Sequence, residues 1–578
     1  MAAELNIAFV TSEVRPFAAT GGLGDVASAL PKALREQGHQ VRLIMPAYAM
    51  IADQGHELEE VPGLGQAISV PNLGEIEVKT ARLPDSGVQV YFLDAITYDF
   101  YRRTQDRATL YGWPDDARRF MLLCRGTLEL LNTLGWKPDV IHCNDWQAGL
   151  IPAYLDSVYK YDFLNTATLY TTHNILFSGP GGLSTRTLHE ASLGLELVPV
   201  IHPHEYYGHF NFAKGALSLA DVVNTVSPTY AQEILQPESD PLPYPVRIAE
   251  GPQVQDHSCR IPNGVGFYNV LRHRQKYRPF LGILNGIDTD YWNPQTDPHL
   301  EMRALLSLAK GLSQPIAIEP ATLDQLSFGP DLPDDVLCQR KALNKRRLQQ
   351  ICGLKVDEQA LLMGRVARIG DQKDYLLMAE GARALQAILE MGCQMVILGR
   401  ASAQDAAGQW YRAEYERLDK AYPGQLAFVN SRWARWLGKG LPADADFEFE
   451  HLLYACSDAF LMPSVYEPCG LSQMVSMRYG SVPIVRRTGG LADTVRDADA
   501  PPDARKGGGF VFDEPSPQAL IEAVRRAQEV FAQQPARWLA LVREGMSRDF
   551  SWGPSAREYA DAYRLAMEVK RKINHLDG

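Results

Sequence analysis

Short apolar runs alternate with helical patterns along most of this 578-residue chain. The runs are dense in Val, Ile and Leu and do not alternate with polar residues, which is typical of parallel strands covered on both faces. We predict strands at residues 5–12, 40–46, 89–94, 139–144, 167–174 and 222–227, and again at 361–366, 394–398, 426–430, 459–463, 482–485 and 509–513. Helical stretches separate these strands, so the pattern predicts an α/β protein with two doubly wound domains.

Two segments lack this rhythm. Residues 237–262 carry six prolines and are expected to be irregular. Residues 293–340 are rich in Pro, Asp and Leu and show no sheet pattern, which is typical of a domain junction. The predicted division of the chain is a first domain at 1–290, an inserted linker region at 291–345, a second domain at 346–550 and a C-terminal helix at 551–578.

Composition narrows the class of protein. The chain has 57 Lys and Arg against 69 Asp and Glu, a net charge of −12, which argues against a general binder of nucleic acid or anionic membranes. Its eight cysteines form no C-x-x-C pair, which indicates reduced thiols and a cytoplasmic location. The first apolar run, residues 7–10, is too short to span a membrane and follows Glu4, so we expect neither an anchor nor a secretory signal.

Three strand-to-helix turns are candidates for ligand binding. They are Thr-Gly-Gly-Leu-Gly at 20–24, Glu-Pro-Cys-Gly-Leu at 467–471 and Thr-Gly-Gly-Leu at 488–491. Glycine lets a backbone approach a ligand, and a helix start offers free N–H groups to anions. Tight turns need glycine anyway, so each turn alone fits a purely structural role equally well. Neither a dinucleotide G-x-G-x-x-G motif nor a G-K-[ST] phosphate loop is present.

Charged and polar residues follow several predicted strands. Arg368 and Lys373 follow the strand at 361–366, where cations could neutralise a diphosphate leaving group, although solvated loop cations are common. Glu467 precedes a helix start and could instead complement the helix dipole. Two further pairs lie at strand ends, Asp145 with Trp146 and His173 with Asn174. Polar side chains at the carboxyl ends of neighbouring parallel strands are placed for a ligand.

In order along the chain, nine stretches resemble the bacterial glycogen synthase and plant starch synthase family. They are residues 16–31 (PFAATGGLGDVASALP), 141–154 (IHCNDWQAGLIPAY), 172–174, 211–214, 224–230 (NTVSPTY), 282–294 (GILNGIDTDYWNP), 467–473 (EPCGLSQ), 487–495 (RTGGLADTV) and 550–552. The resemblance implies a GT-B fold, with two Rossmann-like domains facing a central cleft and the last helices crossing back to the first domain. It also implies transfer of glucose from ADP-glucose to the non-reducing 4-OH of an α-1,4-glucan, with retained anomeric configuration.

The same resemblance implies roles for individual residues. Arg368 and Lys373 would hold the diphosphate of ADP-glucose in place of a metal, so no cofactor or metal is expected. Glu467 would lie at the glucose. His173 and Asp145 would contact the glucose from the first domain. The remaining substrate-binding residues would be Gly21, Gly22, Asn174, Cys469, Gly470, Leu471 and Ser472.

The chain departs from the family pattern at three positions. Ala19 replaces a lysine that touches the donor, Asn144 replaces a histidine, and Asp374 replaces a glycine and puts a negative charge beside the expected phosphate site. Two alternatives therefore stay open: a glucan-binding or regulatory protein with little catalysis, and a GT-B transferase that uses another nucleotide sugar. A phosphorylase is disfavoured because no pyridoxal-phosphate lysine motif is visible. The expected location is cytoplasmic, or a plastid if a transit peptide has been removed.

Overall fold

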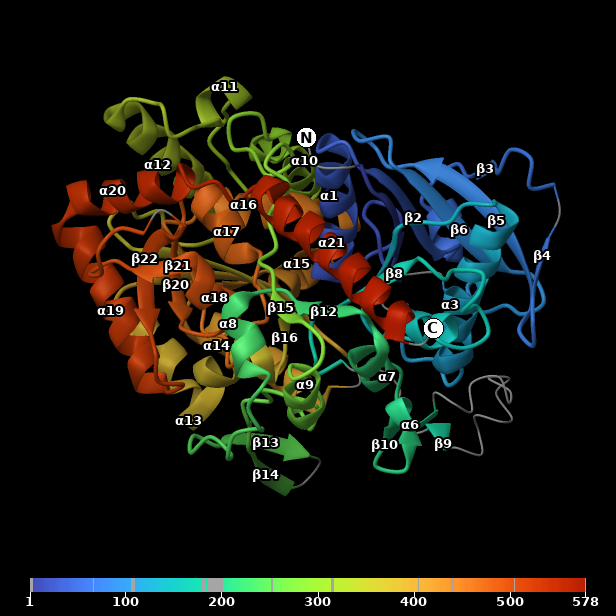
Figure 1. Cartoon of the computed structure of the whole chain (residues 1–578). Helices are drawn as coiled ribbons and strands as arrows, with labels where there is room; N and C mark the ends of the chain where they lie inside the picture. The colour runs from blue at the N-terminus through green and yellow to red at the C-terminus, as the bar shows by residue number, and fades with distance from the viewer. Residues whose placement is uncertain are drawn as a thin grey trace. The chain divides into compact units, whose positions relative to one another are not determined.

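The computed structural model divides the chain into two compact units, which are described separately (Figure 1). Unit 1 comprises Met1–Pro237, Asn263–Gly286 and Ser551–Gly578, and unit 2 comprises Glu238–Pro262 and Ile287–Phe550. The residues that the structure describes are 4–65, 67–104, 110–177, 183–184, 201–250, 253–312, 316–403, 405–437, 441–503 and 505–576. In the described parts, no helix is both long enough and apolar enough to cross a membrane.

Unit 1 is built on a ten-stranded sheet in the order β15-β12-β8-β7-β1-β2-β6-β5-β3, with β4 paired to β5. Its strands are β1 (Asn6–Val10), β2 (Gln40–Pro46), β3 (Glu59–Glu60), β4 (Ile68–Val70), β5 (Gly74–Arg82), β6 (Gln89–Ala95), β7 (Val140–Asn144), β8 (Ala167–Thr172), β12 (Val222–Thr225) and β15 (Phe280–Gly282). The strands from β15 to β6 are parallel, and all of them except β15 confirm the six predictions made for this half. The antiparallel edge of β3, β4 and β5 was not predicted, because β5 alternates buried with partly exposed residues and carries no dense apolar run.

Helices cover this sheet. They are α1 (Gly22–Glu36), α2 (Ala49–Asp53), α3 (Asp116–Thr133), α4 (Ile151–Leu155), α6 (Ile201–His204), α7 (Phe212–Leu219), α8 (Pro228–Glu233), α9 (Tyr268–Arg274), α21 (Trp552–Leu576) and a 3-10 turn at Trp146–Ala148. A small sheet joins β9 (Leu183–Ser184), β10 (Glu205–Tyr206) and β11 (His209–Phe210). The C-terminal helix α21, red in Figure 1, packs beside α1 and on β8. Tyr563 of this helix bonds His142 of β7 at 2.9 Å, so α21 is an integral part of unit 1.

Unit 2 is built on a seven-stranded sheet in the order β18-β17-β16-β19-β20-β22-β21. These strands are β16 (Leu362–Ile369), β17 (Gln394–Ala401), β18 (Leu426–Phe428), β19 (Ala459–Met462), β20 (Val482–Arg486), β21 (Val495–Asp497) and β22 (Gly507–Phe512). All are parallel, and the six predicted strands of this half are confirmed. The helices are α10 (Arg303–Lys310), α11 (Leu323–Leu326), α12 (Asp334–Ile351), α13 (Asp371–Glu390), α14 (Ala406–Ala421), α15 (Val429–Leu437), α16 (Ala443–Cys456), α17 (Ser472–Arg478), α18 (Gly489–Thr494), α19 (Pro517–Gln533), α20 (Pro535–Met546) and a 3-10 turn at Pro298–Glu301.

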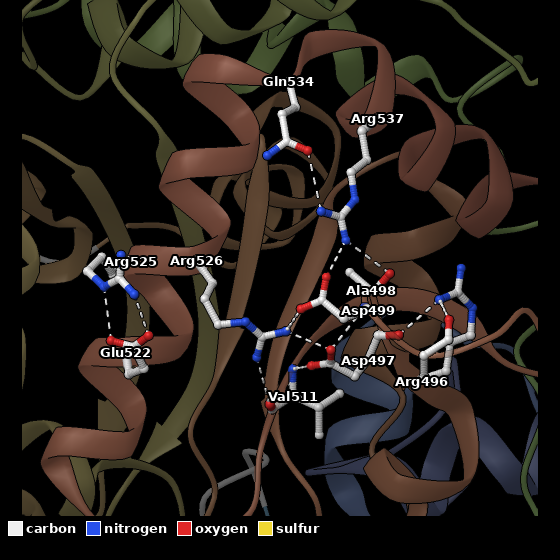
Figure 2. A network of polar contacts seen from close by, with 11 residues as sticks. Arg496, Asp497, Ala498, Asp499, Val511, Glu522, Arg525, Arg526, Gln534 and Arg537 are labelled. Carbon is white, nitrogen blue, oxygen red and sulfur yellow. Dashed lines mark hydrogen bonds and ion pairs between the residues drawn. The ribbon is translucent and has the colours of Figure 1, made fainter.

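Two arginines fasten α19 and α20 to the edge of this sheet (Figure 2). Arg526 of α19 contacts Asp497 at 2.6 Å and Asp499 at 2.7 Å, and Arg537 of α20 contacts Asp499 at 2.5 Å. Asp497 also accepts the backbone N–H of Val511 at 2.9 Å. The network therefore fixes the edge strand β21 and its neighbour β22 by charge as well as by apolar packing.

The described residues of the two segments without an α/β rhythm, other than Pro237, belong to unit 2. The expectation that 237–262 is irregular was wrong, because β13 (Val246–Glu250) and β14 (Gln253–His257) pair as an antiparallel hairpin. His257 bonds Asp371 of α13 at 2.7 Å, which explains why the hairpin belongs to unit 2 rather than to a first domain at 1–290. The predicted linker at 291–345 is likewise grouped with unit 2, and Arg347 of α12 donates to the carbonyl of Leu300 at 2.7 Å.

Candidate active site

An ion pair joins two of the predicted site residues of unit 2. Lys373 lies in the first turn of α13, directly after β16, and its Nζ contacts Oε2 of Glu467. Glu467 lies between β19 and α17, and β19 is the parallel neighbour of β16. The hydroxyl of Ser464 donates to the same carboxylate oxygen at 3.0 Å. The Glu467 side chain is only 7% exposed and that of Lys373 21%, so a buried carboxylate is neutralised by a cation that still reaches the surface.

Arg368 precedes Lys373 in the chain and lies on β16 itself, and it is exposed. Its register partner on β17 is Arg400, which bonds Asp446 at 2.9 Å. Sequence reasoning did not select Arg400, although the Gly-Arg pair at the end of a predicted strand was a signal of the same kind. Two arginines therefore stand side by side at the carboxyl end of the sheet, a setting that suits an anionic ligand.

The turns at 467–471 and 488–491 pack directly against each other. A Cβ at Gly489 would overlap the carbonyl oxygen of Glu467, and a Cβ at Gly490 would overlap that of Cys469. Gly490 also donates its N–H to the Glu467 carbonyl at 3.1 Å, and the φ of Gly489 is +42°. The Thr-Gly-Gly turn therefore has a structural task here, because its glycines let the Glu-Pro-Cys loop lie directly against it.

Three side chains that sequence analysis missed hold this loop. Arg486 donates to the carbonyl of Ser464 at 3.0 Å and also to that of Val465. Gln473 donates to the carbonyls of Cys469 at 3.2 Å and Gly470 at 2.8 Å, and Tyr454 donates to the Ser472 hydroxyl at 3.0 Å. Gly470 has a φ of +70°, and α17 begins two residues later, after Leu471. The loop that carries Glu467 is thus fixed before any ligand binds.

Asp374 turns its carboxylate inward, where its negative charge is paired within unit 2. Its carboxylate is buried and contacts Arg365 at 2.6 Å, and Tyr415 donates to the same oxygen at 2.6 Å. The other oxygen accepts the N–H of Gly370 at 2.9 Å. Arg365 also donates to the carbonyl of Lys373 at 2.5 Å. Asp374 therefore ties Gly370, at the start of α13, to Arg365, and Arg365 in turn helps to position Lys373.

In unit 1, Asp145 and His173 lie together after β7 and β8. Oδ1 of Asp145 accepts the backbone N–H of His173 at 2.7 Å. Nε2 of His173 lies 3.0 Å from Oδ1 of Asn144, whose amide nitrogen donates to the Val10 carbonyl at 3.1 Å. The Asn144 oxygen can only accept, so Nε2 of His173 carries the proton. The asparagine that replaces the family's histidine thus fixes the orientation and tautomer of His173.

Burial sets the charge of both groups. It lowers the pKa of His173 to about 3, so the imidazole is neutral at physiological pH. It raises the pKa of the Asp145 carboxyl to about 7, although hydrogen bonds from the backbone of His173 and Asn174 oppose this. Asp145 also has a φ of +54° and a ψ of −177°, close to a region that is used almost only by glycine. A strained, partly protonated carboxyl beside a neutral histidine is suited to hydrogen-bond a polar neutral ligand such as a sugar.

Asn174 uses its side chain locally. Its Oδ1 accepts the backbone N–H of Leu176 at 3.1 Å, which closes the turn after β8. Its side chain is half-buried, as is that of His173. Asn174 therefore shapes the loop beside His173, and its predicted contact with substrate stays a prediction.

The first glycine turn is held by Glu13, a residue that sequence analysis did not select. Its carboxylate accepts the N–H groups of Thr20 at 2.6 Å and Gly21 at 3.2 Å, and the hydroxyl of Tyr111 donates to it at 2.7 Å. A Cβ at Gly21 would meet no atom within 4 Å, and its φ of −161° is open to any residue. Neither space nor conformation demands glycine at position 21, which favours close approach of a ligand there. Gly22 is the first residue of α1.

Ala19 lies beside this turn in a tight position. It is 5% exposed, and a Cβ at Gly24 would overlap its methyl group. Arg15 contacts Asp25 of α1 at 2.5 Å. Arg15 is the cation nearest in sequence before Ala19, and its guanidinium is already paired with an acid of its own unit.

Known proteins match the chain over nearly its whole length. The model of the starch synthase catalytic domain matches residues 6–243, and that of the glycosyl transferases group 1 matches 444–530. The glycogen synthase of Syntrophotalea carbinolica is 38% identical, with 98% of this chain and 99% of that protein covered. The glycogen synthase of Thermotoga maritima is 32% identical over 97% of this chain and 99% of its own. This chain belongs to the glycogen and starch synthase family.

A solved structure agrees with this family assignment. The catalytic domain of starch synthase IV from Arabidopsis thaliana, bound to ADP and acarbose, superposes with a TM-score of 0.76 at 30% identity, and covers 98% of this chain and 100% of that one. The two Rossmann-like units are those of the GT-B fold, and the protein is a glycosyltransferase. The predicted fold class, family and enzyme class are therefore confirmed.

One cluster in this synthase has the residue types of a metal site. Asp297, His299 and His451 of unit 2 bring ligand atoms within 4.8 Å of one another. Nδ1 of His451 already bonds Asp297 at 2.9 Å, and Tyr479 donates to the same carboxylate oxygen at 2.8 Å. His451 is also bonded to Tyr291 at 3.2 Å through Nε2. Because Asp297 and His451 already bond each other and two tyrosines, we interpret the cluster as a structural network between 291–299 and α16.

Proposed function

We propose that the protein transfers glucose from ADP-glucose to the non-reducing 4-OH of an α-1,4-glucan, with retention of the anomeric configuration. The observation that carries this is the Lys373–Glu467 pair at the carboxyl ends of β16 and β19, in a family whose starch synthase IV binds ADP and acarbose. In this proposal the bond between the anomeric carbon and the diphosphate oxygen breaks, and ADP leaves with the bonding electrons. The acceptor's 4-oxygen forms the new bond to the anomeric carbon, and its proton passes to the departing diphosphate. Lys373 and Arg368 stabilise the negative charge that grows on the departing diphosphate.

The remaining groups receive the following roles. Glu467 either binds sugar hydroxyls or stabilises the positive charge that develops at the anomeric carbon, and its fixed loop keeps the carboxylate in place. Asp145 and His173 of unit 1 bind glucose hydroxyls as neutral or weakly charged hydrogen-bonding partners, which agrees with their pKa values of about 7 and about 3. Gly21 leaves the backbone of its turn open to the donor.

We further propose that transfer needs no metal, because the fixed cations can neutralise the diphosphate themselves. A cytoplasmic location is proposed on the basis of the cysteines, since all eight are free thiols and all but Cys338 are buried.

The test is incubation of the purified protein with short maltooligosaccharides and either ADP-glucose or UDP-glucose, with and without EDTA, followed by analysis of product lengths. We expect chain extension with ADP-glucose at a rate that EDTA leaves unchanged. Extension with UDP-glucose alone would favour another donor. Binding of glucan without any extension would favour the non-catalytic alternative, which the replacement of the family lysine by Ala19 supports. A rate lost in EDTA and restored by Mg²⁺ would refute metal-independent transfer.

A further inference from the structure

Unit 1 has a polar pocket at the amino ends of its parallel strands, whereas Asp145 and His173 lie at the carboxyl ends. Those two residues follow the carboxyl ends of β7 and β8, whereas the pocket lies at the first residues of β2 and β6, Gln40 and Gln89. β2 and β6 are parallel to β7 within one continuous sheet, so the two places lie at opposite ends of the strands. The pocket has a volume of about 400 Å³, within the usual range of small-molecule sites.

Three arginines line this pocket. Strand register puts Arg82 of β5 and Arg42 of β2 on either side of Gln89 of β6, so all three side chains leave the same face of the sheet. Arg35 comes from the last turn of α1 and approaches Gly87, whose carbonyl accepts a hydrogen bond from Arg82 at 3.0 Å. Two separate elements, a helix end and the sheet, thus deliver guanidinium groups to one small volume.

The positive charges of these three arginines are not balanced by an equal number of carboxylates in the pocket. Within the part of the chain that the structure describes, none of Arg35, Arg42 and Arg82 forms an ion pair, and Arg42 instead lies over the ring of Trp136 at 4.2 Å. The one acidic residue in the lining is Glu4. Three cations against one carboxylate leave a net charge of +2 in a concave site. Arginine forks of this kind match the oxygens of a phosphate group.

His39 adds a further donor to the pocket. It is only 7% exposed, and its Nδ1 accepts the backbone N–H of Leu5 at 3.2 Å, so in the neutral ring Nε2 carries the proton. Burial and the positive charge of Arg564 lower the pKa of His39, while Glu4 raises it. The lowered pKa favours the neutral ring, which donates through Nε2.

We propose that this pocket binds a small molecule that carries a phosphate monoester, such as a sugar phosphate. A phosphate monoester carries up to two negative charges, which matches the net charge of the lining. The arginines and the N–H of His39 bind the phosphate oxygens. Gln40, Gln89 and Tyr91 of the lining supply hydrogen-bonding groups for a hydroxyl-bearing carrier. The site is separate from the machinery assigned to glucose transfer, since none of its residues has a role there.

The experiment measures binding by calorimetry and by the shift in melting temperature of the full-length protein. Glucose 6-phosphate, inorganic phosphate and glucose are the three probes. The test variant is Arg35→Gln/Arg82→Gln, and the matched control is Arg102→Gln, an exposed arginine of the same unit outside the pocket. A charged hydrogen bond corresponds to about tenfold in affinity or more, so the double variant should weaken binding roughly 100-fold.

We expect glucose 6-phosphate to bind and to raise the melting temperature, glucose to do neither, and the control to behave as the wild type. The double variant should keep its glucosyl-transfer rate, and Lys373→Ala should keep its binding of glucose 6-phosphate while it loses transfer. These two results separate the pocket from the proposed transfer site, so one proposal can fail without the other. Equal binding in the wild type and the double variant would overturn the proposal, as would an absence of binding by both anions. If inorganic phosphate bound as tightly as glucose 6-phosphate, the proposal of a monoester ligand would be overturned and the free ion would be the ligand.

Discussion

Asp145→Asn should stabilise the protein at alkaline pH and lower its activity. The Asp145 carboxyl lies just after β7, where burial raises its pKa from 3.8 to about 7. A raised pKa means that the folded protein binds the proton more tightly than the unfolded chain does, so ionisation of this carboxyl opposes folding. Asparagine keeps the oxygen that accepts the N–H of His173, but it cannot ionise.

The sign and size of the effect follow from these two pKa values. Below the unfolded pKa of 3.8 the carboxyl is protonated in both states and costs nothing. As the pH rises the unfolded chain loses its proton first, and the folded state is progressively disfavoured until the pH passes about 7. Each pKa unit corresponds to about 1.4 kcal/mol, so the full cost above neutral pH is about 4 kcal/mol. The variant avoids this cost.

The assay is thermal unfolding of the wild type and the variant in buffers from acid to alkaline pH. The difference in melting temperature should be small at about pH 4 and should grow steadily from there up to about pH 8. Asp162→Asn, at an exposed aspartate of the same unit, is the matched control for loss of a carboxylate at the surface. A constant difference for Asp145→Asn, or one that shrinks as the pH rises, would refute the raised pKa.

The activity of the same variant reports on the role of the Asp145 carboxyl. If Asp145 binds a sugar hydroxyl, kcat/KM should fall even though the protein is more stable. Stability gained and activity lost together indicate a site residue that is held in an unfavourable state for the sake of its ligand. Unchanged kcat/KM would mean that Asp145 only shapes the turn.

Three further substitutions test the assigned roles. Lys373→Ala should lower kcat roughly 100-fold, because it removes one charged contact to the departing diphosphate, and a rise in donor KM alone would contradict this. Glu467→Gln keeps an acceptor for the Ser464 hydroxyl, so thermal stability should change little. It removes the negative charge, so kcat should fall strongly. Near-normal kcat with a lower melting temperature would instead identify a helix-capping role. Ala19→Lys should lower the donor KM about tenfold by restoring a charged hydrogen bond, and an unchanged KM would show that the position no longer faces the donor.

The sequence by itself determined the framework of both units. Parallel strands that are buried on both faces must be apolar at nearly every position, so runs such as 40–46 and 394–398 could be recognised from composition alone. It also determined the family, because turns such as 467–473 and 487–495 retain their residues in order. The edge strand β5 and the hairpin of β13 and β14 escaped prediction, since their polar faces and their prolines leave no apolar run.

Tertiary structure alone decided how the chemical groups combine. Lys373 and Glu467 are 94 residues apart and meet because β16 and β19 are neighbours in the sheet, an order that no local pattern encodes. Asp374, which by sequence stood beside the phosphate site, turns inward because Arg365 offers it a buried partner. The three arginines of the pocket are likewise ordinary surface residues in the sequence. A pattern records how a segment is buried, whereas charge pairing depends on which distant segments the fold places next to it.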